Sequence, residues 1–425
     1  MQTMTSDYVI VGSGPGGATV ARELARAGKE VIILEKGKRH KLSKSKIKSY
    51  GIYDKYAVFS RSKEGVIIDR AVTLGGCSLV FSANSFEPPP WFEKAMGMDL
   101  STSTREIKQE IGIKPFSEKF TQNWEATNRL RQASRELGMD LKPQSKFINE
   151  ELCRNYCDGC MTGCRRNAKW TARKWVDEAT DLGCTVMVEA DVKGVIVESG
   201  KAVGVEVKAP GKRFQIRANH VILAAGGIGS AVILQNSGVE NAGKNFFMDP
   251  MNILWGMTED RVSKTTEMTF SCACEDFADS KGFILGNVSG KGAWVSHMMR
   301  PMASGRKILH HYGKWERMVG MFIKIADSNT GRVFPNGTMS KPLTAEDRRR
   351  ADEATEMAAS IMAKAGVIPN SIRVTTNIGG HPHIQNLFNH LWIQGLGRFV
   401  KKHDFRFHGN GSCYGNPLLL STGQC

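Results

Sequence analysis

Three glycines and a carboxylate near the start of the chain have the spacing of a dinucleotide-binding site. Gly12, Gly14 and Gly17 form a G-x-G-x-x-G pattern. The first glycine permits a tight turn, the second lets backbone approach a pyrophosphate, and the third lets a helix pack closely on a sheet. Glu35 follows at the distance where a carboxylate can accept hydrogen bonds from ribose hydroxyls. Because the acid favours an unphosphorylated ribose, the pattern predicts FAD or NAD as the ligand.

Four cysteines lie close together in the middle of the chain. Cys153, Cys157, Cys160 and Cys164 have the spacing C-x3-C-x2-C-x3-C. Four thiolates at this spacing could hold one metal centre: part of the run resembles a ferredoxin motif, and a tetrahedral zinc site also fits. The alternative is a cysteine-rich loop with free thiols or local disulfides. The sequence leaves an iron–sulfur cluster, zinc and no metal open.

The elements around the N-terminal glycines are those that a dinucleotide turn requires. Tyr8–Val11 is a short apolar run typical of a buried parallel strand. A helix is predicted from Pro15 to Ala27, and its N-terminus offers free N–H groups and a positive dipole to a phosphate. Val31–Leu34 is the second strand. This order of elements favours dinucleotide binding over a purely structural glycine turn.

Length and composition predict a globular α/β protein with two structural domains. The chain has 425 residues, of which 41% are hydrophobic and 44 are glycine. The first motif starts at residue 7, which leaves no room for a signal peptide and predicts a cytoplasmic location. The longest nearly apolar run, Val221–Leu234, is too short to span a bilayer. Ten cysteines without an export signal favour free thiols or metal ligands over a disulfide framework.

The formal net charge is +16, and much of it falls in one segment after the second predicted strand. Its basic residues are Lys36, Lys38, Arg39, Lys41, Lys44, Lys46 and Lys48. We favour a solvated loop. The alternative is a patch for an acidic redox partner protein or an anionic membrane surface, which would make the protein peripheral to the membrane. Nucleic-acid binding is not expected, because the segment lacks interleaved aromatic residues beyond Tyr50 and Tyr53.

A second glycine pair, Gly75 and Gly76, lies in the segment Arg70–Asn84. Two glycines beside small polar residues let backbone lie against a flat, bulky group. After a dinucleotide motif, this loop is interpreted as a cofactor contact. Cys77 within the loop could face the cofactor, although a single cysteine is usually buried and inert.

The later segments predict further helices and strands. An amphipathic helix is expected over Ala168–Leu182, and a small meander of strands over 185–218. His220–Ser230 fits a strand that returns to the first sheet and touches the same cofactor, because it lacks the third glycine and the acid of a second dinucleotide fold. Thr344 is a good N-cap for a helix over Ala345–Ala365.

Together these segments resemble the glucose–methanol–choline (GMC) oxidoreductase family. The matching pieces follow the family's order over most of residues 5–383, and they are the N-terminal glycines, Leu74–Ser78 with Asn84, Ala224–Val239 and Gly243–Pro250. The cysteine loop followed by Asn167–Thr171 is similar to a branch that includes long-chain alcohol oxidases. The resemblance implies FAD and the oxidation of a primary or secondary alcohol. Beyond His381, residues 383–411 depart from the family's pattern.

The resemblance also implies site residues. His381, presented by a Gly-Gly turn after a strand, is the implied base that takes the hydroxyl proton while hydride passes to flavin N5. Asn416 is the implied second residue of the catalytic site. The implied cofactor-binding residues are Gly12, Gly14, Gly17, Glu35, Gly75, Gly76, Cys77, Asn84, Val192, Ala225 and Gly226.

The predicted fold class is α/β, with a Rossmann-like FAD-binding domain and a smaller α+β substrate domain. The FAD-binding domain is expected over residues 1–90, 185–250 and 370–425, a helical and cysteine-loop insertion over 91–184, and the substrate domain over 251–369. The favoured function is an FAD-dependent alcohol dehydrogenase or oxidase with an apolar alcohol as substrate. One alternative is a flavin and iron–sulfur electron-transfer subunit, which would not need His381. Another is an NAD-dependent dehydrogenase, which would need neither the Gly75-Gly76 loop nor the returning strand.

Overall fold

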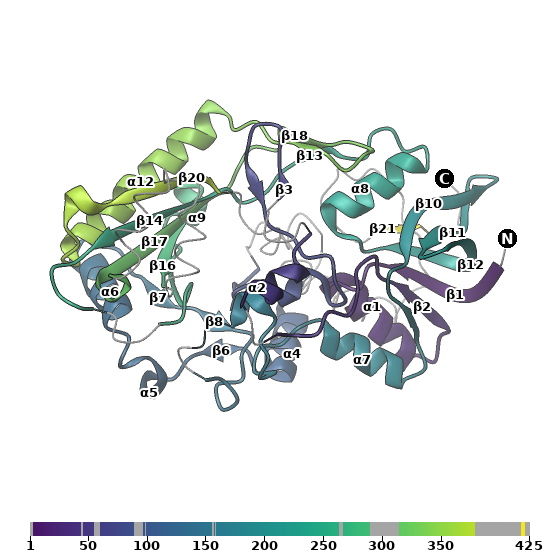
Figure 1. Ribbon diagram of the computed structural model, residues 1–425, viewed down its shortest axis with the longest axis horizontal. Helices are drawn as coiled ribbons and strands as arrows, with labels where there is room; N and C mark the ends of the chain where they lie inside the picture. The colour runs from purple at the N-terminus through teal and green to yellow at the C-terminus, as the bar shows by residue number, and fades with distance from the viewer. Residues whose placement is uncertain are drawn as a thin grey trace.

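Two sheets lie towards opposite ends of the molecule, as the computed structural model in Figure 1 shows. The structure describes residues 3–43, 46–54, 60–88, 97, 99–154, 157, 159–262, 267–289, 314–378 and 418–420. A mixed seven-stranded sheet contains the N-terminal strand, and an antiparallel six-stranded sheet is built mainly from residues after 250. Predicted site residues His381 and Asn416 lie outside the described residues.

The seven-stranded sheet has the order β10-β11-β12-β1-β2-β9, and β21 also pairs with β12. Its strands are β1 (Thr3–Val11), β2 (Val31–Leu34), β9 (Thr185–Met187), β10 (Asp191–Glu198), β11 (Lys201–Ala209), β12 (Lys212–Leu223) and β21 (Leu418–Leu420). β1 runs parallel to both β12 and β2, and β2 runs parallel to β9. The strands β10, β11 and β12 are antiparallel to one another.

The predicted meander and the predicted returning strand share one long strand. β12 continues without a break through Asn219 and His220, because β1 lies beside it in parallel register up to Leu223. The His220 ring stacks on the Tyr8 ring with their centroids 4.6 Å apart, which lets a polar residue stay within the strand. The division expected between these strands was therefore wrong.

Helices cover both faces of this sheet, as Figure 1 shows at its right. The helices α1 (Pro15–Arg26) and α7 (Arg173–Asp181) cover one face, and α8 (Gly226–Asn236) covers the other. Consecutive residues of β1 point to opposite faces, so Ile10 joins the cluster under α1 while Val9 joins the cluster under α8. The β1–α1–β2 unit confirms the predicted α/β class with a Rossmann-like first domain.

The six-stranded sheet has the order β20-β14-β17-β16-β15-β7. Its strands are β7 (Lys142–Pro143), β14 (Met251–Met257), β15 (Cys272–Cys274), β16 (Phe283–Val288), β17 (Met318–Ile325) and β20 (Arg373–Ile378). The helices α12 (Ala345–Lys364) and α6 (Glu125–Glu136) contribute to the apolar cluster on one face, which also contains Met321 and Ile323 of β17. Phe322, between them, points to the other face and joins a second apolar cluster.

The remaining elements are mostly short. They are α2 (Lys46–Ser49), η1 (Tyr50–Ile52), β3 (Ser60–Arg61), β4 (Ile67–Ile68), η2 (Gly76–Leu79), β5 (Asn84–Ser85), α4 (Ser101–Ile111), β6 (Lys114–Pro115), α5 (Glu118–Thr121), β8 (Ser145–Lys146), η3 (Cys160–Thr162), β13 (Lys244–Phe246), α9 (Ala278–Lys281), η5 (Trp315–Arg317), β18 (Gly331–Val333), β19 (Met339–Ser340) and η6 (Pro369–Ser371). Among the described helices, none is both long and apolar enough to cross a membrane. The domain boundaries given above stay a proposal.

The helix predicted over Ala168–Leu182 begins later, at Arg173. Residues before it run extended, because Lys169 forms a β-bridge with Ile148 and the Trp170 N–H donates to the Phe147 carbonyl oxygen at 2.8 Å. The amphipathic pattern of the sequence continues into this segment, but pairing with a distant segment replaces its first helical turns.

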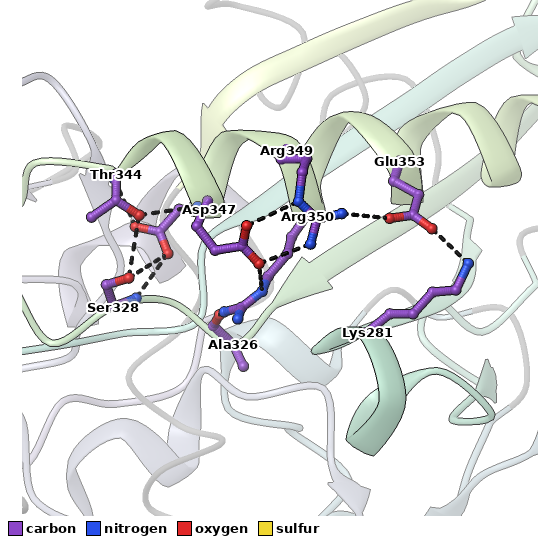
Figure 2. Close-up of polar contacts among 9 residues, drawn as sticks. Lys281, Ala326, Ser328, Thr344, Asp347, Arg349, Arg350 and Glu353 are labelled. Atoms are coloured by element: carbon purple, nitrogen blue, oxygen red, sulfur yellow. Dashed lines mark hydrogen bonds and ion pairs between the residues drawn. The ribbon is translucent and has the colours of Figure 1, made fainter.

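The predicted N-cap of the long helix α12 is confirmed. Figure 2 shows Thr344 and Asp347 in a capping box, in which the Asp347 N–H donates to the Thr344 hydroxyl at 3.1 Å and the Thr344 N–H donates to the Asp347 carboxylate at 2.8 Å. Asp347 also accepts hydrogen bonds from the N–H and hydroxyl of Ser328 at 2.8 and 3.0 Å. The cap therefore fixes the start of α12 to the loop that follows β17.

We expect Thr344→Ala to lower the free energy of unfolding by about 1 kcal/mol, because the first turn loses an acceptor for its N–H group. Glu353→Gln on the same helix is the control: Glu353 makes exposed ion pairs with Lys281 and Arg349, and surface pairs contribute less than about 0.5 kcal/mol. Denaturant unfolding measures both variants. Equal losses in the two would contradict the role of the cap.

Candidate functional site

The glycines of the first turn have different structural roles. Gly12 has a φ of +103°, and a Cβ atom added there would lie 2.3 Å from the Ala224 carbonyl oxygen. A Cβ atom added at Gly17 would lie 1.9 Å from the Gly12 carbonyl oxygen. A Cβ atom at Gly14 would meet nothing within 4 Å. Gly12 and Gly17 therefore serve close protein packing, whereas Gly14 leaves open space at the N-terminus of α1, where backbone N–H groups can receive a phosphate.

The turn after β12 meets the turn after β1. The contact between Gly12 and Ala224 places the start of α8 beside the first glycine turn. Ala225 is the N-cap of α8, and its N–H donates to the Ser230 hydroxyl at 3.1 Å. Gly226 is exposed and has a φ of +72°, and a Cβ atom added to it would meet nothing within 4 Å. The carboxyl ends of two neighbouring parallel strands thus present two helix N-termini at one edge of the sheet.

Glu35 connects the glycine turn with the end of β2. Its Oε2 atom accepts from the hydroxyl and the N–H of Ser13 at 2.5 and 3.2 Å, and Oε1 accepts from the Gly37 N–H at 2.7 Å. Burial raises the pKa of Glu35, and the hydrogen bonds from Ser13 and Gly37 oppose this effect. A carboxylate has about four acceptor positions. Hydrogen bonds within the protein use three of these acceptor positions, so the fourth could accept a hydrogen bond from a ribose hydroxyl.

Ser13 also makes a hydrogen bond to the second glycine loop, which contains Gly75 and Gly76. Its hydroxyl oxygen accepts from the Gly75 N–H at 3.0 Å. Gly76, with a φ of +54°, approaches the first turn so closely that an added Cβ atom would lie 2.9 Å from the Gly14 Cα atom. Sequence reasoning missed Ser13, which occupies a variable position of the glycine pattern. Its hydroxyl brings the two predicted cofactor-binding loops together around Gly14.

Cys77 and Val192 are placed differently from the glycines. The Cys77 sulfur accepts from the Ala71 N–H at 3.3 Å, and burial raises the pKa of this thiol to about 11. The thiol is therefore protonated at neutral pH and is not a nucleophile. Val192 is buried at the start of β10, in the same apolar cluster as Leu34. Their roles in cofactor binding stay predictions.

The side chain of Asn84 is bonded within the protein. Its Nδ2 group donates to the Phe270 carbonyl oxygen at 2.8 Å, and its Oδ1 atom accepts from the Lys146 ammonium at 2.7 Å. Lys146 is fully buried and also donates to the carbonyl oxygens of Ser82 and Phe270. Burial lowers the pKa of Lys146 to about 7. Asn84 and Lys146 thus join the loop after Gly76 to the segment before β15.

A second buried lysine fixes the same loop to the cysteine segment. The Lys169 ammonium donates to the carbonyl oxygens of Leu79 and Phe81, both at 2.9 Å, and of Cys160 at 2.5 Å. Its backbone N–H donates to the Cys164 sulfur at 3.3 Å. Burial lowers the pKa of Lys169 to about 8. No sequence pattern singles out either lysine, because their burial depends on contacts between distant segments.

The four clustered cysteines were predicted to hold an iron–sulfur cluster or zinc, or to hold no metal. All four are free, with Cys157 exposed and Cys164 buried. Burial raises the pKa of Cys153 to about 12 and that of Cys160 to about 11. Within the described part of the chain, no three His, Cys, Asp or Glu side chains are placed to hold a metal ion. The described residues therefore give no support to a metal centre.

The face of the six-stranded sheet that points away from α12 is apolar. The buried residues of this face and its surroundings are Ile67, Met161, Met251, Ile253, Trp255, Phe270, Val288, Met318 and Phe322. Met161 comes from the cysteine loop, so this loop reaches the apolar face. At its edge, Ile378 at the end of β20 lies opposite Met251 of β14. His381, the predicted base, follows three positions later in the sequence.

Several residues of the basic segment are paired with acids. Lys36 lies 3.6 Å from Asp191, Lys38 lies 3.4 Å from Glu189, and Arg39 makes an ion pair with Asp177 at 2.7 Å. These pairs reduce the charge that the segment can offer to a partner. Binding of a redox partner or a membrane surface stays a prediction.

Comparison with known sequences identifies the N-terminal part of the chain. A family model described as GMC oxidoreductase matches residues 6–251. An uncharacterised GMC-type oxidoreductase of Mycobacterium tuberculosis is 27% identical over 77% of this chain and 54% of its own length. A long-chain-alcohol oxidase of Arabidopsis thaliana is 24% identical over 85% of this chain and 52% of its own length. The chain therefore spans about half the length of these two curated relatives.

Other comparisons cover more of the matched proteins. An uncharacterised protein of Methanocaldococcus jannaschii is 27% identical over 88% of this chain and 86% of its own length. The crystal structure of pyridoxine 4-oxidase from Mesorbium loti superimposes with a TM-score of 0.65 over 94% of this chain and 100% of that chain, at 13% identity. This likeness confirms the fold, because the sequence identity is too low to carry function.

The contrast between the glycines gives a testable prediction. Gly17→Ala should lower the free energy of unfolding by roughly 2 kcal/mol or more, because its methyl group would overlap the Gly12 carbonyl oxygen. Gly14→Ala should change it by less than about 0.5 kcal/mol, because Gly14 has an ordinary φ of −63° and open space around it. Thermal unfolding of the two variants tests this. A loss of stability in Gly14→Ala as large as in Gly17→Ala would refute the division of roles.

Lys146 gives a pH-dependent prediction. Its pKa falls from 10.5 to about 7 in the folded state. Between these values the unfolded chain binds the proton and the folded chain does not, so this group makes the folded state more stable as pH rises. The free energy of unfolding of wild type minus that of Lys146→Met should therefore increase from pH 7 to 10, by at most ~1.4 kcal/mol per pH unit.

Denaturant unfolding at several pH values measures this slope. Lys142→Met is the matched control, because Lys142 lies on β7 with its side chain largely exposed. Its difference from wild type should not change with pH. A flat difference for Lys146→Met would mean that the buried ammonium keeps its proton throughout this range.

Proposed function

Because this chain belongs to the GMC oxidoreductase family, we propose that it is an FAD-dependent oxidoreductase that acts on the CH–OH group of an apolar alcohol. The observation that carries the proposal is the meeting of three loops at the open Gly14 position. The turns after β1 and β12 abut through Gly12 and Ala224, and the Gly76 loop lies against Gly14. Such a site suits a dinucleotide whose pyrophosphate lies at a helix N-terminus.

The residues present fit FAD. Gly14 has no side chain to cap α1, and the first turn of α1 contains no acidic residue, so its N–H groups are suited to a pyrophosphate. Glu35 keeps one acceptor position for an adenosine ribose, as described above. The Gly75-Gly76 loop, which lies against Gly14, would contribute further contacts to the cofactor. These observations support cofactor binding. The proposed chemistry also depends on the second sheet.

The apolar face of the second sheet supports an apolar substrate. Trp255, Phe270 and Phe322 are large side chains on or beside this face, and methionines of β14, β17 and the cysteine loop adjoin them. Methionine adapts its shape to flexible chains. The plant relatives named long-chain-alcohol oxidases agree with such a substrate.

Bound FAD would supply the acceptor for the hydride that leaves the alcohol carbon. We assign His381 as the base that accepts the hydroxyl proton, and Asn416 as the second polar residue that orients the alcohol oxygen. β20 ends at Ile378, opposite Met251 of the apolar face, and His381 follows three positions later in the sequence. A base contributes about 10²–10⁴-fold to such a reaction when it reaches the proton directly.

The absorbance spectrum of protein purified without oxygen tests the function. We expect flavin bands that bleach on adding straight-chain primary alcohols, and His381→Ala should slow this bleaching by at least about 100-fold. His383→Ala, two positions away, is the control and should bleach like wild type. Gly14→Ala should retain its fold but bind less flavin.

Each other outcome excludes a part of the proposal. Protein without flavin bands would remove the cofactor assignment. Flavin that no alcohol bleaches in wild type would favour an electron-transfer protein without an alcohol site. Normal bleaching in His381→Ala would remove this residue as the base.

A further inference from the structure

The guanidinium group of Arg173 makes hydrogen bonds to three oxygen atoms. Arg173 is the first residue of α7 and is partly buried. Its Nε atom donates to the Leu74 carbonyl oxygen at 2.8 Å, and its two Nη atoms donate to the His40 carbonyl oxygen and the Thr73 hydroxyl, both at 3.0 Å. A Cβ atom added at Gly75 would lie 2.8 Å from the Arg173 Cγ atom. One side chain therefore joins the start of α7, the segment after β2 and the second glycine loop.

A single peptide group links Arg173 to the carboxylate of Glu35. The Leu74 carbonyl oxygen and the Gly75 N–H belong to one trans peptide, so they point in opposite directions. The carbonyl oxygen accepts from Arg173, and the N–H donates to the Ser13 hydroxyl oxygen at 3.0 Å. The Ser13 hydroxyl in turn donates to Glu35 at 2.5 Å. A series of three hydrogen bonds thus runs from a cationic group to an acidic group.

The charges at the two ends of this series suit each other. The hydrogen bonds of Glu35 to Ser13 and Gly37 are all donated to it, as an ionised carboxylate requires. Burial lowers the pKa of Arg173 to about 10, so its guanidinium is still charged at neutral pH. Opposite charges at the ends polarise each hydrogen bond between them, which strengthens the whole series.

Gly75 does not fix the orientation of this peptide by itself. Its φ is +86°, and glycine moves easily between backbone conformations. Arg173 on one side and Ser13 on the other hold the Leu74–Gly75 peptide in place. Without Arg173 the peptide can rotate, its N–H can leave Ser13, and the Ser13 hydroxyl is free to turn away from Glu35. The acceptor position of Glu35 that suits a ribose hydroxyl then loses its fixed direction.

We propose that Arg173 is a positioning residue of the cofactor site, which holds Ser13 and Glu35 in the orientation that accepts a ribose hydroxyl of the cofactor. This inference rests on the proposed function, because it assigns the adenosine part of FAD to Glu35. Arg173 acts through the Leu74–Gly75 peptide and not on the nucleotide. Its loss should therefore weaken recognition of the ribose hydroxyls more than binding of the phosphates, which the N-terminus of α1 receives.

Calorimetric binding of ADP and of 2′,3′-dideoxy-ADP to flavin-free protein tests this inference. The two nucleotides share adenine and diphosphate and differ only in the ribose hydroxyls. Wild type should bind ADP at least about tenfold more tightly, because a hydrogen bond to a buried carboxylate is strong. Arg173→Met should reduce this preference to less than about threefold, while its affinity for the dideoxy nucleotide should change by less than about threefold.

Arg39→Met is the matched control. Arg39 also contacts α7, but it does so through an ion pair with Asp177, and its side chain is 53% exposed. This variant should keep the wild-type preference for ADP. Ser13→Ala interrupts the same series of hydrogen bonds, so adding Arg173→Met to it should lower the preference no further.

Arg173→Lys keeps the test decisive if Arg173→Met does not fold. Lysine retains the charge, but its compact ammonium group cannot reproduce the fork of the guanidinium, so its preference for ADP should lie between those of wild type and Ser13→Ala. A wild-type preference in Arg173→Met, or in Arg173→Lys where only that variant folds, would overturn the inference. An equal loss of affinity for both nucleotides would also overturn it, since this result indicates a general role in the fold.

The wild-type protein separates this inference from the proposed function. If it binds neither FAD nor ADP, the cofactor assignment fails and the inference falls with it. If it binds FAD but does not distinguish ADP from the dideoxy nucleotide, Glu35 does not recognise the ribose. The inference is then wrong, while the assignment of FAD stands.

Discussion

The buried carboxylate of Glu35 constrains three segments at once. It accepts from both polar hydrogens of Ser13 and from the Gly37 N–H, and the Ser13 hydroxyl in turn accepts from the Gly75 N–H. A carboxylate taken out of water must be hydrogen-bonded, so these donors cannot leave without a large cost in free energy. The end of β2, the turn after β1 and the second glycine loop therefore move together. Their common position leaves the space beside Gly14 open.

Two buried ammonium groups continue this arrangement towards the second sheet. Residues 79–84 have little regular structure, so their carbonyl oxygens need donors from elsewhere. Lys146 and Lys169 each provide three N–H groups to nearby oxygen atoms. A lysine is suited to this task because its three donors rotate about one point. The cost is a buried charge, because neither ammonium group has a carboxylate partner among the described residues. Burial therefore lowers the pKa of both lysines.

Local patterns predicted the first unit of the fold well. Strand, glycine turn, helix and strand follow one another within a short stretch, and the Thr344 cap depends on residues three positions apart. Features that depend on distant partners could not be predicted. Lys169 was assigned to a helix, yet it lies in an extended segment because Ile148 pairs with it. The cysteine spacing suited several ligands equally, since it does not determine whether the sulfur atoms converge.

The parallel pairing of β1 has a consequence for synthesis on the ribosome. Val9 lies opposite Val221, so β1 must wait for a strand made about 200 residues later, or roughly 10–40 s at usual elongation rates. The outer neighbour of β2, β9, is also translated late. During this time the nascent chain exposes two apolar strands with unpaired edges, which are sites for aggregation. Nascent chains stalled before residue 212 should therefore depend on chaperones. The sheet can be completed only after β12 has emerged from the ribosome.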